Sequence, residues 1–114
     1  MSDMRLITCI VLKDKGDSVI SEAMNAGAQG ATYFTGTGTG IRQSLGLTII
    51  PEKEIIFIVT KGEQTEIVLE AVKKGGNLDK PGEGFVYVTK IESAFGFLED
   101  YQKEQTDRET GVSP

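Results

Sequence analysis

The stretch EIIFIVTKGEQTEIVLEAVKKGG, residues 54–76, decides the fold because a strand, a turn and a helix follow one another in it. Its first part, Glu54 to Thr60, is a run of apolar and β-branched residues with the length of a strand. In its second part, four apolar residues recur at i, i+1, i+4 and i+5: Ile67, Val68, Ala71 and Val72. This spacing forms one apolar stripe on a helix, so the stretch predicts a strand followed by an amphipathic helix.

Residues on either side of that stripe predict the limits of the helix. Thr60 and Glu63 have the spacing of a capping box at the N-terminus, and Gly75 and Gly76 are suited to end the helix. The turn between strand and helix has the sequence TKGE.

The first quarter of the chain repeats the same order of elements. Arg5 to Leu12 is apolar on both faces, as expected of a strand inside a sheet. After a second Lys and Gly turn, KDKG, four residues repeat the helix stripe: Val19, Ile20, Ala23 and Met24. Gly27 suits the position that ends this helix.

Two shorter strands complete the pattern. Ala28 to Phe34 ends in β-forming residues, and Phe85 to Val88 follows the turn-rich sequence NLDKPGEG. The order βαββαβ predicts an α+β protein of the ferredoxin-like, split βαβ arrangement with an antiparallel sheet.

Composition narrows the range of functions. A chain of 114 residues is suited to one domain, and its net charge of −5 without a basic patch argues against nucleic-acid binding. Histidine is absent, so the commonest general base and transition-metal ligand are both missing, and we expect no enzymatic activity. The single cysteine, Cys9, lies in an apolar run. With no apolar segment of membrane-spanning length, we expect a cytoplasmic protein without direct membrane insertion.

The end of the chain divides into two parts. After Lys90 comes a small apolar cluster, expected to cover a sheet edge or to pack against a neighbouring subunit: Ala94, Phe95, Phe97 and Leu98. Residues 102–114 are polar and predict a disordered tail, so the domain is expected to comprise residues 1–101.

The sequence GATYFTGTGTGIRQSLG, residues 30–46, is the most suggestive for ligand binding. Alternating glycines let a backbone approach a ligand closely and leave N–H groups free to bind an anion, and Arg42 adds a planar, charged fork beside them. A mobile glycine-rich loop without a ligand is the competing interpretation. The segment from Thr35 to Pro51 shows no periodicity, and connections of this length are more often functional than idle.

Together these motifs resemble the PII signalling protein superfamily, whose members are trimers that bind adenine nucleotides between subunits. Gly30, Ala31 and Thr32 are similar to the Gly-x-Thr of the family's second strand. The run from Gly38 to Gln43 is similar to its Gly-x-Gly-Arg-Gln, with the extra residue Ile41. The sequence from Gly82 to Phe85 follows the spacing of the family's Gly-Asp-Gly-Lys but lacks the lysine. NLDKPGEG resembles a branch associated with membrane transporters.

The resemblance implies a homotrimer with ligand sites at subunit boundaries. Phosphates would be held by the backbone of Gly38 and Gly40, by Arg42, and by the turn of a neighbouring subunit that contains Gly82, Glu83 and Gly84. Thr32 and Gln43 would contact the base edge or ribose, Val59 and Ile7 would wall the base, and Lys80 would replace the missing lysine. The residue-level alternatives are a plain turn at Gly82 to Gly84 and an ordinary strand residue at Thr32.

Departures from the family pattern indicate a ligand of low charge. Typical members have an arginine pair after the last strand, whereas this chain has Lys90 and Glu92. AMP, ADP or a cyclic nucleotide therefore fits better than ATP. The effector loop is short and lacks tyrosine, so its covalent modification is not expected. Four apolar residues of SLGLTIIP would form a docking element for a partner, or else be partly buried against the sheet: Leu45, Leu47, Ile49 and Ile50.

The leading interpretation is a non-enzymatic sensor of an adenine nucleotide or another metabolite that regulates a partner protein, for which a membrane transporter is one candidate. A metal-handling trimer of the copper-tolerance type and a PII-like protein without nucleotide binding are the alternatives. An acylphosphatase is disfavoured because the glycine loop follows the second strand rather than the first. A dinucleotide fingerprint fails because its third glycine would fall at Ile41.

Overall fold

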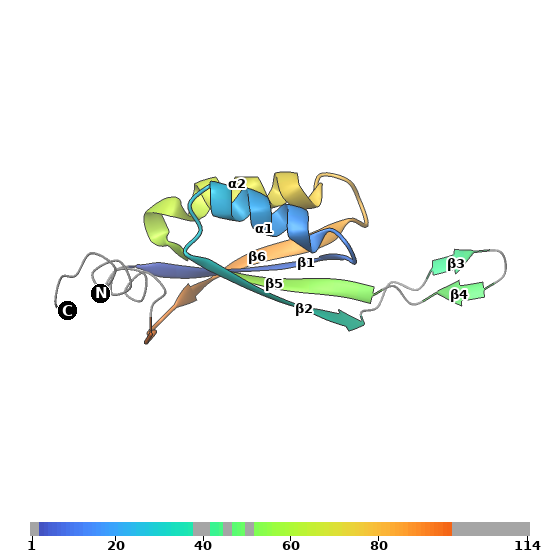
Figure 1. The fold of residues 1–114 in the computed structure, drawn as a ribbon, viewed down its shortest axis with the longest axis horizontal. Coiled ribbons are helices and arrows are strands. Elements are labelled where there is room, and N and C mark those ends of the chain that lie inside the picture. Colours follow the sequence, from blue (N-terminus) through green and yellow to red (C-terminus); the bar gives the residue numbers. More distant parts are fainter. Residues whose placement is uncertain (1–2, 38–41, 45–46, 50–51, 97–114) are drawn as a thin grey trace, which may run out of the picture.

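The structure is a computed structural model, which describes residues 3–37, 42–44, 47–49 and 52–96. Four strands form the main sheet: β1 (Met4–Leu12), β2 (Gly30–Thr37), β5 (Glu52–Lys61) and β6 (Gly84–Ile91). Their order is β2-β5-β1-β6, and every neighbouring pair is antiparallel. Helices α1 (Gly16–Asn25) and α2 (Thr65–Gly76) lie together on one face of this sheet (Figure 1). The predicted βαββαβ ferredoxin-like fold is confirmed.

A hairpin that the sequence did not predict occupies the connection from Thr35 to Pro51. Strands β3 (Arg42–Ser44) and β4 (Leu47–Ile49) pair with each other in a separate two-stranded sheet. Figure 1 places this hairpin beyond the ends of β2 and β5, away from the helices. The predicted tail, residues 102–114, lies outside the described residues.

The two helices begin differently from the sequence prediction. A short 3-10 turn, η1 (Gly62–Gln64), precedes α2, so Glu63 comes before the helix and the predicted capping box is wrong. Instead, the Thr65 hydroxyl donates to the Lys61 carbonyl at 3.1 Å and pairs with the Thr60 hydroxyl at 2.9 Å. At the start of α1, the backbone N–H of Gly16 donates to Glu54 Oε1 at 2.7 Å, so a carboxylate from β5 acts as the N-terminal cap.

The ends of the helices confirm one prediction and correct another. Gly27 follows α1 with φ of +103°, as predicted. Helix α2 ends at Gly76, and Asn77 rather than a glycine takes the left-handed conformation. Gly75 serves helix packing, because a Cβ there would lie 2.9 Å from the Ser18 carbonyl oxygen and from Val19 Cα.

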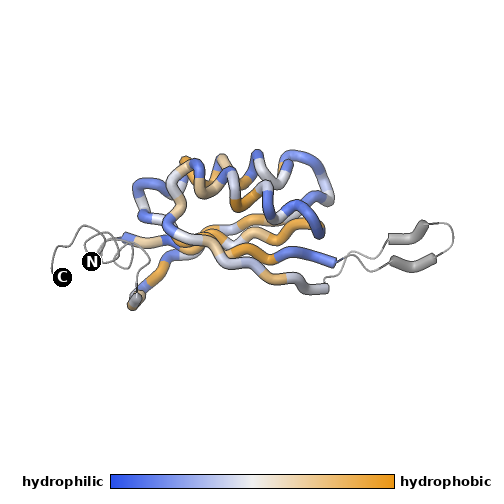
Figure 2. The backbone as a smooth tube through the Cα atoms, viewed as in Figure 1, coloured by the Kyte–Doolittle hydropathy of each residue, from blue (hydrophilic) through white to orange (hydrophobic). Residues whose placement is uncertain are grey.

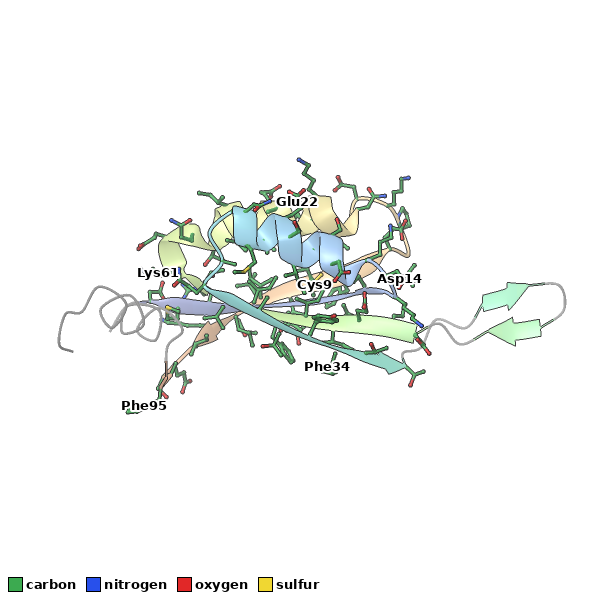
Figure 3. All side chains as sticks on the ribbon, viewed as in Figure 1. Cys9, Asp14, Glu22, Phe34, Lys61 and Phe95 are labelled. Carbon is green, nitrogen blue, oxygen red and sulfur yellow. The ribbon has the colours of Figure 1, made fainter. Side chains whose placement is uncertain are left out.

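The core lies between the sheet and the helices. Alternate residues of β1 and β5 point into it and are fully buried: Ile7, Cys9, Val11, Ile56 and Ile58. Val19 and Ala23 of α1 and Val68 and Val72 of α2 close the core from above. The apolar strands beneath the helices stand out in Figure 2. Cys9 lies between the layers in Figure 3, and its burial raises the pKa of the thiol to about 12.

No helix of the described residues lies on the opposite face of the sheet. Its residues alternate with those of the core and include several large, exposed apolar side chains: Phe34, Phe85 and Tyr87. The rings of Phe34 and Phe57 lie 5.7 Å apart between centroids, as do those of Phe85 and Tyr87. Figure 3 shows Phe34 on the side of the sheet away from the helices. We call this surface the helix-free face.

Candidate functional site

Thr32 and Val59, two predicted ligand contacts, line one hollow of about 450 Å³. Thr32 pairs with Phe57 across β2 and β5, and Gly30 pairs with Val59. These residues share the strand register of Phe34, so the hollow opens on the helix-free face. The segment after β6 supplies the remaining wall. The complete lining is Gln29, Gly30, Ala31, Thr32, Phe57, Val59, Ile91, Ala94, Phe95 and Gly96.

The lining is chemically uniform. None of its ten residues carries a charge, and only Gln29 and Thr32 have polar side chains. A hollow of this size and character suits a flat, uncharged ring better than a phosphate. Thr32 and Val59 thus lie in one hollow, and their contact with a ligand stays a prediction.

The second predicted ligand element, the turn before β6, lies at the other end of the sheet. Gly84 pairs with Val11, and Val59 pairs with Leu6. The β1 partners, Leu6 and Val11, are five positions apart, which corresponds to about 17 Å along an antiparallel strand. A single chain therefore does not bring the hollow and the turn together.

The turn itself is sharply bent and packed against β1. Gly82 has φ of +81°, and a Cβ there would meet open space. The Glu83 N–H donates to the Lys80 carbonyl at 3.3 Å, and the Glu83 carboxylate lies 3.9 Å from Lys15 Nζ. A Cβ on Gly84 would lie 2.6 Å from the Ile10 carbonyl oxygen, so this glycine is required by packing. Lys80 is exposed beside the turn.

The glycine loop is described only in part. Gly38, Gly40, Leu45 and Ile50 lie outside the described residues. The backbone of β3 contains Arg42 and Gln43, which pair with Ile49 and Thr48 of β4, and Leu47 begins β4. Because β2 ends at Thr37 and β5 begins at Glu52, the hairpin extends from the same end of the sheet as the Gly82 turn.

Comparison with known proteins identifies the fold family. The family model for the nitrogen regulatory protein P-II matches residues 4–97. The chain belongs to the P-II family. It is a regulatory protein of that family, in agreement with the resemblance predicted from its motifs.

Individual relatives are distant. The chain is 24% identical over 96 residues to the nitrogen fixation nifHD region GlnB-like protein 1 of Methanobacterium ivanovii, covering 81% of this chain and 91% of that protein. The B. subtilis GlnK–ATP complex has a TM-score of 0.63 and 22% identity, covering 80% of this chain and 84% of that one. At such identity the structural likeness concerns the fold alone.

A further match shows the same fold within a longer chain. The Bacillus cereus protein related to NIF3 has a TM-score of 0.63 and 19% identity over 81% of this chain. The match covers 26% of that protein, so this chain spans about a quarter of its length.

One residue predicted to wall the base lies in the core, and the hollow has lining residues that the sequence did not predict. Ile7 is fully buried beneath the helices and cannot wall a surface site. Phe57, Ile91 and Gln29 line the hollow without having been predicted. Ala94 and Phe95, expected at a sheet edge or a subunit contact, line the hollow of their own chain. The apolar character of both faces of EIIFIVT was the signal for Phe57.

The described part of this P-II chain also bears on metal and membrane binding. Among residues 3–37, 42–44, 47–49 and 52–96, no three His, Cys, Asp or Glu side chains gather as a metal site would require. The raised pKa of the Cys9 thiol leaves it protonated at neutral pH, which disfavours metal ligation. No helix in the same ranges has the length and apolar character needed to span a bilayer.

Proposed function

We propose that the protein is a non-enzymatic, cytoplasmic regulator that forms a homotrimer and binds an adenine nucleotide of low charge, such as AMP or ADP, between subunits. Binding orders the hairpin of β3 and β4 and changes its contact with a partner protein, for which a membrane transporter is the leading candidate. P-II membership and the geometry of this chain support the homotrimer and the nucleotide.

The separation of the two ligand elements is the observation that carries the proposal. The hollow with Thr32 and the turn with Gly82 lie at opposite ends of one sheet, about 17 Å apart along β1. Neither element alone offers both an apolar seat for a base and backbone N–H groups for phosphate. A neighbouring subunit, placed so that its turn faces this hollow, completes the site.

The helix-free face supports assembly. Phe34 and Phe85 are 49% and 62% exposed, and both lie on one sheet face. Monomeric proteins rarely expose several large apolar side chains side by side, because covering them stabilises the folded state by about 25 cal/mol per Å². Contact with further copies of the chain would remove this surface from water.

Charges near the turn favour a ligand with few phosphates. Lys15 lies against Glu83, and Lys13 Nζ lies 3.0 Å from Glu52 Oε2. The hydrogen bond from Lys13 and the negative charge of Glu52 raise the pKa of that lysine. Both lysines are thus already neutralised by carboxylates, which leaves less positive charge for a triphosphate than for AMP or ADP.

The hairpin is placed to report on the ligand. It begins at the sheet end where the Gly82 turn lies, and its strands contain Arg42 and Gln43 in β3 and Leu47 and Ile49 in β4. A phosphate bound at this end would engage Arg42 at the start of β3 and fix the hairpin in one orientation. The apolar residues from Leu45 to Ile50 would then meet the partner.

Calorimetry with AMP, ADP, ATP and cyclic AMP, with and without Mg²⁺, tests the nucleotide. We expect AMP or ADP to bind more tightly than ATP. Arg42→Ala should weaken binding of the phosphorylated ligands by about 1.5–3 kcal/mol, the contribution of hydrogen bonds to charged groups. Thr32→Val should cost about 0.5–1.5 kcal/mol through loss of one neutral hydrogen bond.

Thr35→Val provides the matched control. Thr35 lies on β2, is exposed and does not line the hollow, so its replacement should leave binding unchanged. Light scattering of the same samples should give the mass of three chains. Absence of any heat with all four nucleotides, or a ligand response that Arg42→Ala and Thr32→Val leave intact, would contradict the proposed site.

A further inference from the structure

The loop between β1 and α1, residues 13–16, contacts two parts of the chain that are far apart in the sequence. Strand β1 lies between β5 and β6 in the sheet, and both neighbours are antiparallel to it. The end of β1 therefore lies beside the start of β5, which follows the hairpin, and beside the start of β6, which follows the Gly82 turn. We call residues 13–16 the connector. Figure 3 shows Asp14 of the connector at the end of the sheet from which the hairpin extends.

On one side, the connector is bonded to the first residues of β5. The Lys13 N–H donates to the Glu52 carbonyl at 3.2 Å, and Lys13 Nζ lies 3.0 Å from the Glu52 carboxylate. Glu54 lies on the helix-covered face, since it pairs in the sheet with the fully buried Val11. Its carboxylate accepts a hydrogen bond of 2.7 Å from the N–H of Gly16, the first residue of α1. The connector thus holds the first two carboxylates that follow the hairpin.

On the other side, the connector contacts the turn before β6. Lys15 Nζ lies 3.9 Å from Glu83 Oε2, and the Glu83 side chain is only 22% exposed. Asp14, with φ of +75°, takes the left-handed conformation and turns the chain sharply between the two lysines. Lys13 and Lys15 therefore contact different elements although one residue separates them.

The contacts of the connector with β5 differ in strength. Both side chains of the Lys13–Glu52 ion pair are more than half exposed, and such pairs contribute little to stability. The hydrogen bond between Glu54 and Gly16 is partly buried and charge-assisted, and it satisfies an N–H that has no partner within the helix. A Cβ on Gly16 would lie 2.8 Å from Glu54 Oε1, so the carboxylate occupies the space beside this glycine. Glu54 therefore makes the strongest contact between β5 and the connector.

We propose that the connector couples the start of β5, and with it the base of the hairpin, to the turn before β6 in the same chain. A displacement of Glu83 releases Lys15 and shifts Gly16, and the Glu54 carboxylate moves with it. The same contacts act in reverse, because coupling between two sites is reciprocal. A ligand or partner that engages either element thereby changes the other. The inference goes beyond the proposed function, since these contacts lie within one chain and need no nucleotide.

Amide hydrogen exchange of the protein without ligand, measured residue by residue by NMR, tests the coupling. The N–H groups of Gly16 and Lys13 report on the contacts with β5. The Glu83 N–H, which donates to the Lys80 carbonyl at 3.3 Å, reports on the turn. Amides in the middle of β1 are the internal reference, because a general loss of stability raises their exchange as well.

Substitutions on each side should change exchange on the other side. Glu54→Ala should raise exchange of the Gly16 N–H by about 2- to 30-fold, the range expected for loss of a helix cap. Through the connector, exchange of the Glu83 N–H should rise by about 1.5- to 5-fold, as for loss of a partly exposed ion pair. Glu83→Gln should raise exchange at Gly16 and Lys13 by a similar factor. Glu54→Gln keeps the side-chain length and an acceptor oxygen, so its effects should be smaller than those of Glu54→Ala.

Gly16→Ala removes the same contact without removing the carboxylate. The added Cβ displaces the Glu54 carboxylate from the Gly16 position. Alanine favours a helix more than glycine does, so this change would stabilise α1 if the cap had no role. We expect faster exchange of the Glu83 N–H instead. Slower or unchanged exchange there would contradict the role of Glu54.

Glu70→Gln is the matched control. It breaks another exposed ion pair, with Lys73 Nζ at 3.1 Å, on α2 and outside the connector, and should leave all three amides unchanged. The coupling is wrong if Glu54→Ala leaves the turn unchanged or Glu83→Gln leaves the β5 contacts unchanged. It is also wrong if Glu70→Gln or the reference amides of β1 respond equally. A chain that shows the coupling and binds no nucleotide would retain this inference and lose the proposed function.

Discussion

The two faces of the main sheet are built from similar residues and meet very different surroundings. On the helix-covered face, Ile56 and Ile58 of β5 are fully buried. On the helix-free face, Phe85 and Tyr87 of β6 are 62% and 43% exposed. Apolar residues occur in both registers of β1 and β5, so hydropathy along these strands does not distinguish the faces. The difference comes from the two helices, which both pack on the same side.

This contrast shows which apolar face of the sheet a single chain buries and which it leaves exposed. An antiparallel sheet with one face in water normally alternates apolar and polar residues, whereas β1 and β5 are apolar in both registers. The helices complete the covered face. In the proposed function, further copies of the chain and, at the hollow, a ligand would cover the helix-free face.

The largest expected effect comes from placing a charge on the helix-free face. Phe85→Glu puts a carboxylate into the proposed subunit contact, where an unpaired ion costs several kcal/mol. We expect the variant to sediment as a monomer at concentrations where the wild type is a trimer. Circular dichroism should show that its secondary structure is retained.

Ile67→Glu is the matched control for this charge. Ile67 is 58% exposed, close to the value for Phe85, but it lies on α2. Its replacement should leave the assembly intact. A monomeric wild type, or equal dissociation of both variants, would show that the helix-free face is not the subunit contact.

The next largest effect is a change in the free energy of unfolding, and it differs between neighbouring residues of β5 on opposite faces. Ile56→Ala opens a cavity in the helix-covered core and should lower the free energy of unfolding by about 2–5 kcal/mol. Ile55→Ala, one residue earlier and on the helix-free face, should cost less at concentrations where the chain is monomeric. The loss of unfolding free energy caused by Ile55→Ala should grow with protein concentration if assembly covers that face.

Denaturant unfolding at low and high protein concentration measures the free energy of unfolding of both variants. A concentration-independent cost for Ile55→Ala would mean that no second copy packs there. Equal costs for the two variants at low concentration would mean that the helix-free face is already covered within one chain.

The same two-faced apolar pattern explains what sequence reasoning could reach. The fold was predictable because helix stripes such as that of α2 and strands such as β1 differ clearly in period. Which residues of β1 face the helices was not predictable, since both registers are apolar. Ile7 was therefore assigned to the ligand when it belongs to the core, and Phe57 was missed although it lines the hollow.

The predictions for the helix caps were wrong or incomplete for a different reason. The Thr60 and Glu63 spacing satisfies the capping-box rule, but a 3-10 turn precedes the helix. The Thr65 hydroxyl makes the hydrogen bonds at this end, to the Lys61 carbonyl and the Thr60 hydroxyl. The cap of α1 comes from Glu54, 38 residues away in the sequence, a contact that no local pattern reveals. Thr32 and Val59, both predicted from the family motif to contact the ligand, line one hollow because β2 and β5 are neighbours in the sheet.

The smallest effect concerns the Cys9 thiol, which is sealed under the covered face. Burial raises its pKa from 9.0 to about 12, so above pH 9 the unfolded chain loses this proton before the folded chain does. The thiol's contribution to stability is fully present below about pH 9 and is lost as the pH rises toward 12. By linkage, the slope is at most about 1.4 kcal/mol per pH unit.

Urea unfolding from about pH 8 to about pH 10 measures this slope, and Cys9→Ala is the control because every other titrating group is retained. The variant should have a flatter pH profile than the wild type. In the folded wild type the thiol should resist a thiol reagent that modifies it rapidly in urea. Rapid modification of the native protein would mean that the helices move away from the sheet often enough to expose Cys9 to solvent. The two faces of the sheet would then differ only in how often each is exposed.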